Sequence, residues 1–169
     1  LHTAGALDMN VLEGSKEEFG VLYPLQSLSA DRNIRMGRIP FLVEASSPSV
    51  LEEIKDLAFT ISEWVEEADS LKRLKVHLAA VFANNFSNHM VHVAQELLKE
   101  AELDPSMLKP ILKETFQKLK ELDAYSSQTG PAVRGDQESM NKHIELLRDH
   151  PEWEKLYTFI SRDIERSRE

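Results

Sequence analysis

Residues 69–99 contain neither Gly nor Pro, so nothing in this stretch of the sequence interrupts a helix. At 1.5 Å per residue, a helix of that length spans roughly 45 Å. Placed at 100° per residue, the stretch gathers apolar residues on one face. These residues are Ala79, Phe82, Ala83, Phe86, Met90, Val93, Ala94 and Leu97. We therefore expect the chain to be organised around one long amphipathic helix.

The opposite side of this helix carries amides and imidazoles where a surface helix would carry Lys and Glu. Because these polar residues lie between Leu78, Val81 and Val91, we expect them to be buried and hydrogen-bonded. The row consists of His77, Asn84, Asn88 and Gln95, with Asn85 and His92 on its flank. Residue chemistry alone predicts a helical globular protein with a polar seam, and it implies no reaction.

Composition excludes several classes of protein. The chain has 169 residues, with 29 acidic against 20 basic side chains, for a net charge of −9. That field repels phosphate backbones, and no cluster of Lys and Arg with interleaved aromatics occurs, so we expect no nucleic-acid partner. No apolar run approaches the ~20 residues of a membrane span. The absence of Cys excludes disulfides and Cys-ligated zinc and fits a cytoplasmic location.

The N-terminal third of the chain reads as alternating strands and helices. Residues 19–25 and 40–45 are rich in β-formers, and Ser47 with Pro48 begins a helix. The other elements expected here are a strand end at 1–3, a short helix at 6–12 closed by Gly14, and a last strand at 64–65. This order indicates part of an open α/β sheet that is too short for a complete doubly wound domain.

From residue 69 onward, only helices are expected, which places a domain boundary near residues 67–70. The domains are thus residues 1–68, an α/β segment, and residues 69–169, all helical. Asp104-Pro105 and Pro151 begin helices, and Asp136 caps another that runs to about residue 148. Residues 124–135 hold the only dense cluster of Gly, Pro and Ser, which predicts a loop.

Two polar motifs are candidates for a ligand-binding or catalytic site. In the motif from Thr129-Gly130-Pro131 to Arg134-Gly135-Asp136, a guanidinium suited to a carboxylate or phosphate precedes a helix N-terminus. The alternative is structural, with Asp136 serving only as a cap. His89 and His92 lie three residues apart, but no acidic residue joins them on that face, so we predict no metal site and no Ser-His-Asp triad.

The segment from His77 to Phe86 (HLAAVFANNF), followed by Thr129-Gly130-Pro131 and Arg134-Gly135-Asp136, resembles the C-terminal half of a known bacterial family. That family comprises Rossmann-like NAD(P)-dependent oxidoreductases, similar in architecture to pyrroline-carboxylate reductase and 6-phosphogluconate dehydrogenase. His2-Thr3-Ala4-Gly5 and Tyr23-Pro24-Leu25-Gln26 resemble its late Rossmann strands. The resemblance covers nearly the whole chain in the right order.

The resemblance implies a Rossmann domain that binds the dinucleotide and a helical domain that completes the cleft and forms a homodimer through the helix at 69–99. It implies catalytic roles for His77 and Asn85. By position it also assigns substrate contacts to Arg134, Asp136, Gln26 and Gly130, and cofactor contacts to His2 and Tyr23. The sequence departs from the family at Ala4 and Asn84, where Ser is usual, and at Tyr23, where His is common.

The six glycines never form G-x-G-x-x-G, the loop that cradles a dinucleotide pyrophosphate. The chain also begins at Leu1 without an initiator Met or a signal peptide, so we expect it to be a piece of a longer protein that does not bind NAD(P) tightly by itself. Two functions stay open. The chain is either the substrate cleft of a reductase acting on a small carbonyl, imine or hydroxy acid, or a non-catalytic helical dimerisation module.

Overall fold

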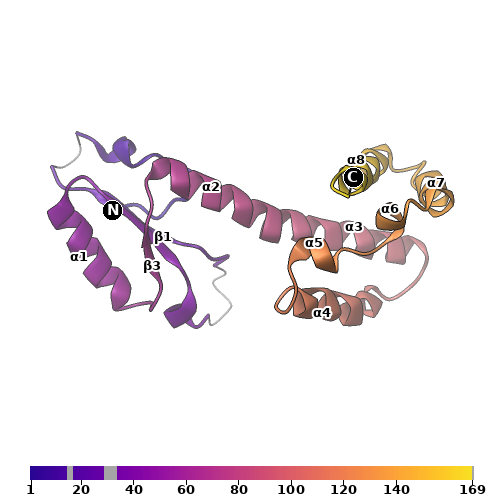
Figure 1. Cartoon of the computed structure of the whole chain (residues 1–169), viewed down its shortest axis with the longest axis horizontal. Coiled ribbons are helices and arrows are strands. Elements are labelled where there is room, and N and C mark those ends of the chain that lie inside the picture. The colour runs from indigo at the N-terminus through magenta and orange to yellow at the C-terminus, as the bar shows by residue number, and fades with distance from the viewer. Residues whose placement is uncertain (15–16, 29–33, 169) are drawn as a thin grey trace. The chain divides into compact units, whose positions relative to one another are not determined.

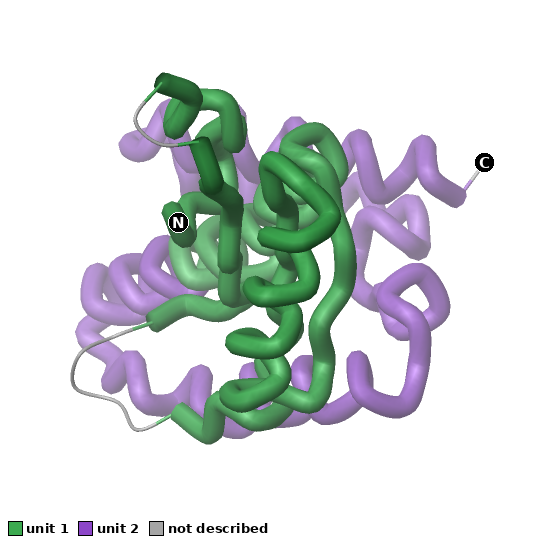
Figure 2. The backbone as a smooth tube through the Cα atoms, turned by 90° about the vertical axis from the view of Figure 1, so that its left-hand side faces the viewer, with its two compact units in different colours: residues 1–90 green, residues 91–169 purple. Residues whose placement is uncertain are grey.

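The computed structural model describes residues 1–14, 17–28 and 34–168. The chain forms two compact units, Leu1–Met90 and Val91–Glu169 (Figures 1 and 2). Unit 1 contains a small sheet, one helix packed on it and the first half of the long helix. Every element that is described entirely within unit 2 is a helix.

The sheet of unit 1 has three strands, β1 (Gly20–Pro24), β2 (Phe41–Ala45) and β3 (Val65–Glu67), in the order β1-β2-β3. β1 is antiparallel to β2 and β2 is parallel to β3. His2 forms a single parallel bridge with Val21 on the free side of β1. The strands predicted at 19–25, 40–45 and 64–65 are confirmed with ends shifted by one or two residues. The helix expected at 6–12 is shorter, a single 3₁₀ turn (η1, Met9–Leu12).

Helix α1 (Pro48–Phe59) covers one face of this sheet. Its start follows the predicted pattern, because Pro48 occupies the first turn and the Ser47 side chain accepts a hydrogen bond from the Val50 amide. Val50, Ile54 and Ala58 of α1 are buried together with Leu22, Phe41 and Val43 of the sheet. This face forms the larger hydrophobic core of unit 1.

The other face of the sheet carries Val21, Tyr23 and Leu42, against which Val76 of the long helix packs. Successive side chains of a strand point to opposite faces, so Tyr23 lies opposite Leu22 and faces the long helix rather than α1. The alternation along β1 therefore brings Tyr23 to the element that carries His77.

The predicted long helix is confirmed and runs as three consecutive segments. They are α2 (Ser70–Ala80), the π-helical segment η3 (Val81–Phe86) and α3 (Ser87–Glu100). Asp69 caps the start, its carboxylate accepting a 2.7 Å bond from the Lys72 amide. The π-helical hydrogen bonding of η3 was not predicted.

The predicted burial of the polar row is wrong for four of its members. Asn84, Asn85, Asn88 and His92 are exposed, and only His77 and Gln95 are half-buried. The reason is the short contact between helix and sheet, which involves Arg73, Val76 and His77 near the helix start. The later turns of the helix within unit 1 have no sheet residues to pack against, so their apolar face is also exposed.

Unit 2 contains the larger part of α3 and the helices that follow it: η4 (Pro105–Leu108), α4 (Lys109–Lys118), α5 (Ala124–Ser127), α6 (Pro131–Arg134), α7 (Gln137–Leu146) and α8 (Pro151–Arg166). The helix starts predicted at Asp104-Pro105, Asp136 and Pro151 are confirmed. Ala132, Met140 and Leu147 form the buried contacts among α6, α7 and α8 (Figure 1).

The prediction of an uninterrupted loop over residues 124–135 is wrong, because α5 and α6 each form one helical turn there. Asp123 supplies a cap for α5 by accepting a 2.9 Å bond from the Ser126 amide. Gly130 (φ 117°) and Gly135 (φ 63°) enclose α6 in backbone conformations that favour glycine. Gly130 and Gly135 therefore mark the two ends of the helical turn α6, and Pro131 is its first residue.

An α/β segment followed by helices, mostly helical overall, is the fold class predicted from the sequence. The contacts divide the chain inside α3, at Met90–Val91, instead of at the start of the long helix. The assignment of residues 1–68 and 69–169 as domains stays a prediction. Within the described residues, no helix combines the length and apolar character needed to cross a bilayer.

Candidate functional site

A cavity of about 630 Å³ lies within unit 1, between the end of β1 and the side of α2 and η3. It brings together four residues that the sequence assigned to a site. These are Tyr23, Gln26, His77 and Asn85. The other lining residues are Leu25, Ser27, Val76, Ala79, Ala80, Val81, Ala83 and Asn84. The predicted gathering of residues from β1 and from the long helix is therefore present within this unit.

Tyr23 and His77 form the buried wall of this cavity. The Tyr23 hydroxyl lies 3.1 Å from His77 Nδ1, and the two rings meet edge to face with centroids 6.0 Å apart. Tyr23 is only 8% exposed, and this burial raises the pKa of its hydroxyl. The hydroxyl therefore stays protonated and available for hydrogen bonding at neutral pH.

Gly5 lies directly against this pair. A Cβ atom at position 5 would be 2.5 Å from His77 Nδ1 and 2.9 Å from Tyr23 Cζ. No side chain fits at these distances, so the close approach of the backbone requires glycine. This contact explains how the segment His2–Gly5 reaches the cavity wall from the other side of β1.

His2 is near this wall but does not line the cavity. Its backbone pairs with β1, and its Nδ1 accepts a 3.2 Å bond from the Ala4 amide. Burial, aided by the nearby Arg73 guanidinium, lowers the pKa of its imidazole. Its Nε2 is buried and has no partner among the described residues. The predicted cofactor contact of His2 is untested.

Asn84 and Asn85 are placed by the π-helical segment η3. The side-chain amide of Asn84 donates to the side-chain oxygen of Asn85 at 3.4 Å, and both residues line the cavity. A π-helical turn shifts the direction of the side chains that follow it and frequently marks a functional position. Its occurrence at the cavity is a structural signal that the sequence pattern did not provide.

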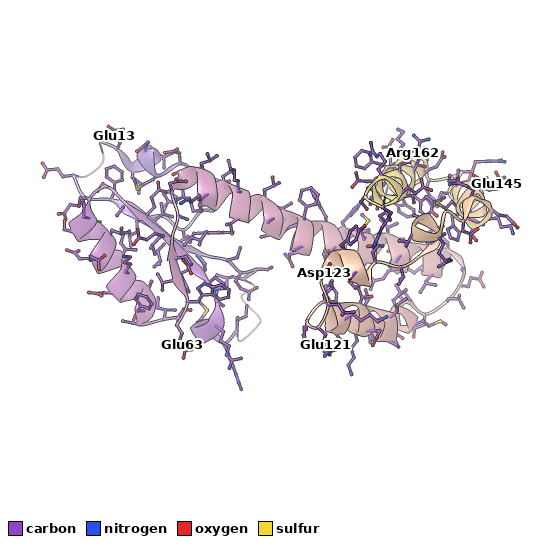
Figure 3. All side chains as sticks on the ribbon, viewed as in Figure 1. Glu13, Glu63, Glu121, Asp123, Glu145 and Arg162 are labelled. Carbon is purple, nitrogen blue, oxygen red and sulfur yellow. The ribbon has the colours of Figure 1, made fainter. Side chains whose placement is uncertain are left out.

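The described lining of the cavity contains no Asp, Glu, Lys or Arg, although the chain carries a net charge of −9. The acidic side chains of the described residues lie elsewhere, and Glu13, Glu63 and Glu145 project from the surfaces of their own units (Figure 3). The cavity therefore offers neutral donors and acceptors on an apolar base. Such a lining suits an uncharged polar group or a small polar ligand.

A buried ion pair fixes the start of α2, one turn before His77. Arg73 is fully buried and donates to the Glu44 carboxylate, to the Leu7 carbonyl and, at 3.1 Å, to Ser70 Oγ. Ser70 in turn donates its amide proton to Glu44 at 3.0 Å. Sequence reasoning missed this network, because Arg73 follows Lys72 in a basic run that resembles a solvated face.

The other predicted site residues belong to unit 2. Arg134 is exposed, and its Nη2 lies 3.9 Å from Asp136 Oδ2. Asp136 caps α7 by accepting bonds from the Ser139 amide at 3.0 Å and the Ser139 hydroxyl at 2.7 Å. These two bonds lower the pKa of Asp136, and the bond from the Ser139 hydroxyl has the larger effect. Gly130 precedes α6. The structural role proposed for Asp136 is thus observed, and the substrate contacts of these three residues are untested.

In the part of the chain that the structure describes, no three His, Asp or Glu side chains come together as a metal site would require. The candidate site is therefore the cavity of unit 1, and His77 is the imidazole among its described lining residues.

Comparison with known proteins gives three findings. The family described as a domain of unknown function (DUF2520) matches residues 39–164. A Bacteroides fragilis protein described as a putative NADP oxidoreductase is 43% identical over 98% of this chain, with a TM-score of 0.93. A Thermotoga maritima protein at 24% identity covers 99% of the chain with a TM-score of 0.79 and shares the fold. No curated protein matches at a significant level.

The chain spans 64% of the length of the Bacteroides protein and 67% of that of the Thermotoga protein. The high TM-scores over nearly all of this chain confirm the predicted fold class, a partial Rossmann-type segment followed by a helical domain.

Proposed function

This chain belongs to the family described as a domain of unknown function (DUF2520), and we propose that the full-length protein is an NAD(P)-dependent oxidoreductase whose substrate cleft includes the cavity of unit 1. One observation carries the proposal: His77, Tyr23, Gln26 and Asn85 meet around a cavity of about 630 Å³. The likeness to the Bacteroides protein, described as a putative NADP oxidoreductase, supports the class of reaction. The reaction is hydride transfer to or from a small carbonyl, imine or hydroxy acid.

In this proposal His77 and Asn85 act directly on the substrate. An imidazole can donate or accept a proton, and an amide can hold an oxygen or nitrogen in place by hydrogen bonding. Gln26 lines the same cavity and contributes a second amide. Holding the substrate in one orientation relative to the hydride donor contributes to rate as much as proton transfer does.

The cavity fits the uncharged end of the proposed cofactor better than its phosphates. The nicotinamide ring carries a neutral carboxamide, which matches a lining of amides and small apolar residues. The pyrophosphate needs backbone amides from a Gly-rich turn, and the sequence has no such motif. We therefore expect weak binding of NADPH to residues 1–169 alone, and isothermal titration showing micromolar affinity would contradict this.

Arg134 is proposed to hold an anionic group of the substrate, with Asp136 and Gly130 shaping its surroundings. The guanidinium is exposed, and its ion pair with Asp136 is long at 3.9 Å. A loosely held guanidinium can exchange that contact for a two-pronged bond to a carboxylate.

The test uses Asn85→Ala and Arg134→Ala in the full-length protein, with Asn88→Ala as the matched control. Asn88 is an exposed amide on the same helix and does not line the cavity. We expect both test variants to weaken substrate binding and turnover in NADPH absorbance assays of small carbonyl, imine and hydroxy-acid compounds. Unchanged cofactor and substrate binding in both variants rejects the assignment.

A second function, a helical dimerisation module, is favoured by the exposed apolar face of the long helix. Phe82 and Phe86 are 62% and 49% exposed, and their rings meet edge to face with centroids 5.0 Å apart. Ala79 and Ala83 on the same face permit close approach of a second helix. We propose that two copies pair isologously along this face. Since Ala79 and Ala83 also line the cavity, the second copy would then lie beside the cavity.

Sedimentation tests the dimer. Phe82→Asp is expected to convert a dimer into a monomer, whereas Phe159→Asp, which changes an equally exposed aromatic residue of unit 2, leaves it intact. A wild-type chain that sediments as a monomer at high concentration removes this proposal.

A further inference from the structure

We propose that Tyr23 is a positioning residue that holds His77 in the tautomer with its proton on Nε2. His77 then presents an N–H donor to an acceptor oxygen of the ligand in the cavity. The identity of that ligand rests on the proposed function, whereas the tautomer is a property of this chain by itself.

The first step is which nitrogen faces the cavity. The Tyr23 hydroxyl is bonded to His77 Nδ1, and the backbone at Gly5 lies so close that a Cβ there would be 2.5 Å from the same nitrogen. Nδ1 is therefore enclosed by protein. No described residue bonds Nε2, and His77 lines the cavity, so Nε2 is the ring nitrogen left to contact a ligand.

The second step is the direction of the hydrogen bond. Tyr23 is 8% exposed, and among the described residues its hydroxyl has only His77 Nδ1 as a partner. If Nδ1 carried the proton and donated it, the hydroxyl proton of Tyr23 would have no acceptor among the described residues. Buried donors without partners are disfavoured, so the hydroxyl donates to Nδ1. Burial raises the pKa of Tyr23 and keeps that proton in place.

The third step is the chemistry of the ligand. A neutral imidazole that accepts at Nδ1 must carry its proton on Nε2 and can only donate there. The described lining adds amide donors from Gln26, Asn84 and Asn85 and no charged group. At Nε2 the site therefore favours an acceptor oxygen, as in a carbonyl or hydroxy compound, over a protonated imine, which has no lone pair to accept.

Nitrogen NMR of the histidine-labelled chain tests the tautomer directly. Spectra recorded at about pH 8.5, where an ordinary imidazole is neutral, distinguish protonated from unprotonated ring nitrogens. We expect wild-type His77, assigned by its loss in His77→Gln, to show a single tautomer with a protonated Nε2. Tyr23→Phe should show a mixture of both tautomers at His77.

The matched control is Tyr157→Phe, which removes a similar Tyr–His bond in unit 2 and should leave the His77 signals unchanged. A wild-type spectrum with the proton on Nδ1 overturns the proposal, even if the Tyr23→Phe variant fails to fold. An identical tautomer ratio in wild type and folded Tyr23→Phe also overturns it. If the tautomer is as expected but His77→Ala retains full activity in the full-length protein, the proposed role of His77 in the reaction fails and the positioning of His77 by Tyr23 stands.

Discussion

The two units contain tyrosine–histidine pairs of nearly the same geometry in different surroundings. In unit 1, Tyr23 Oη lies 3.1 Å from His77 Nδ1, with ring centroids 6.0 Å apart at 74°. In unit 2, Tyr157 Oη lies 2.8 Å from His143 Nδ1, with centroids 5.6 Å apart at 88°. The bond and the ring contact therefore do not distinguish a candidate site from a surface contact.

The surroundings do distinguish them. Tyr23 is buried, Gly5 encloses the bonded nitrogen, and both members of the pair line a cavity. His143 is exposed on α7, and its pair joins that helix to α8. A hydrogen bond selects a tautomer reliably only where water cannot compete for the same atoms. A Tyr–His pair is therefore a candidate site where protein encloses the bonded ring nitrogen and the rest of the pair lines a cavity.

Arg73→Met is expected to produce the largest difference in stability between the two units. It removes the buried ion pair one turn before His77 and leaves Glu44 without its partner. Loss of one member of a buried ion pair costs about 3–5 kcal/mol of unfolding free energy. Urea unfolding can follow the units separately, since Trp64 lies in unit 1 and Trp153 in unit 2. The transition seen by Trp64 should move to lower urea.

The control for this prediction is Arg134→Ala, whose ion pair with Asp136 is exposed and long. We expect no measurable change in either transition. Equal effects of the two substitutions would show that the Arg73 network does not stabilise unit 1.

Gly5→Ala is expected to displace Tyr23 and His77 in unit 1 and to leave the tyrosine–histidine pair of unit 2 in place. The added methyl group would overlap His77 and Tyr23, and overpacking of this kind costs about 1–3 kcal/mol. Gly37→Ala is the control, because a Cβ there meets no atom within 4 Å. Thermal unfolding should show a lower melting temperature for the first variant alone, and similar melting temperatures would exclude the close approach at Gly5.

Tyr23→Phe and Tyr157→Phe delete the same hydrogen bond in the two settings. The buried bond should contribute about 1 kcal/mol to the unfolding free energy, whereas water replaces the exposed one. Urea titration of both variants measures the difference. A larger loss in Tyr157→Phe would reverse the ranking of the two pairs.

His2 adds a pH dependence that is expected only in unit 1. Since burial lowers its pKa, the folded chain binds a proton less readily than the unfolded chain. The stability from neutral His2 is complete above about pH 6.5 and is lost as the pH falls through that value toward the lowered pKa. Denaturation between pH 7.5 and about 5 should show a smaller slope in His2→Asn, and an unchanged slope would contradict the lowered pKa.

Much of the fold followed from local signals. The absence of Gly and Pro over residues 69–99 predicted the long helix, and Ser47-Pro48 predicted the start of α1, because caps and breakers act within a few residues. The two single turns α5 and α6 were missed, since one turn has no periodicity to detect. The π-helical segment left no trace in the sequence, and the polar row appeared buried because side-chain type does not reveal how far a helix stays in contact with a sheet.

The candidate site was predicted mainly through the family resemblance. Tyr23, Gln26, His77 and Asn85 do line one cavity, but residue chemistry alone did not bring them together. The contact among Gly5, Tyr23 and His77 joins positions far apart in the chain, for which no local pattern exists. The role of Arg73 was hidden for the same reason, because its partners Glu44 and Leu7 lie on other elements.

The most direct test of the account compares two variants of the full-length protein, one lacking His77 and the other lacking His143. The quantity measured is NADPH-linked turnover. His77→Ala is expected to lower turnover by about 10²-fold or more, as loss of a group that acts on the substrate does, while His143→Ala stays close to wild type. Equal activity of the two variants would contradict the assignment of the unit 1 cavity as the site of reaction.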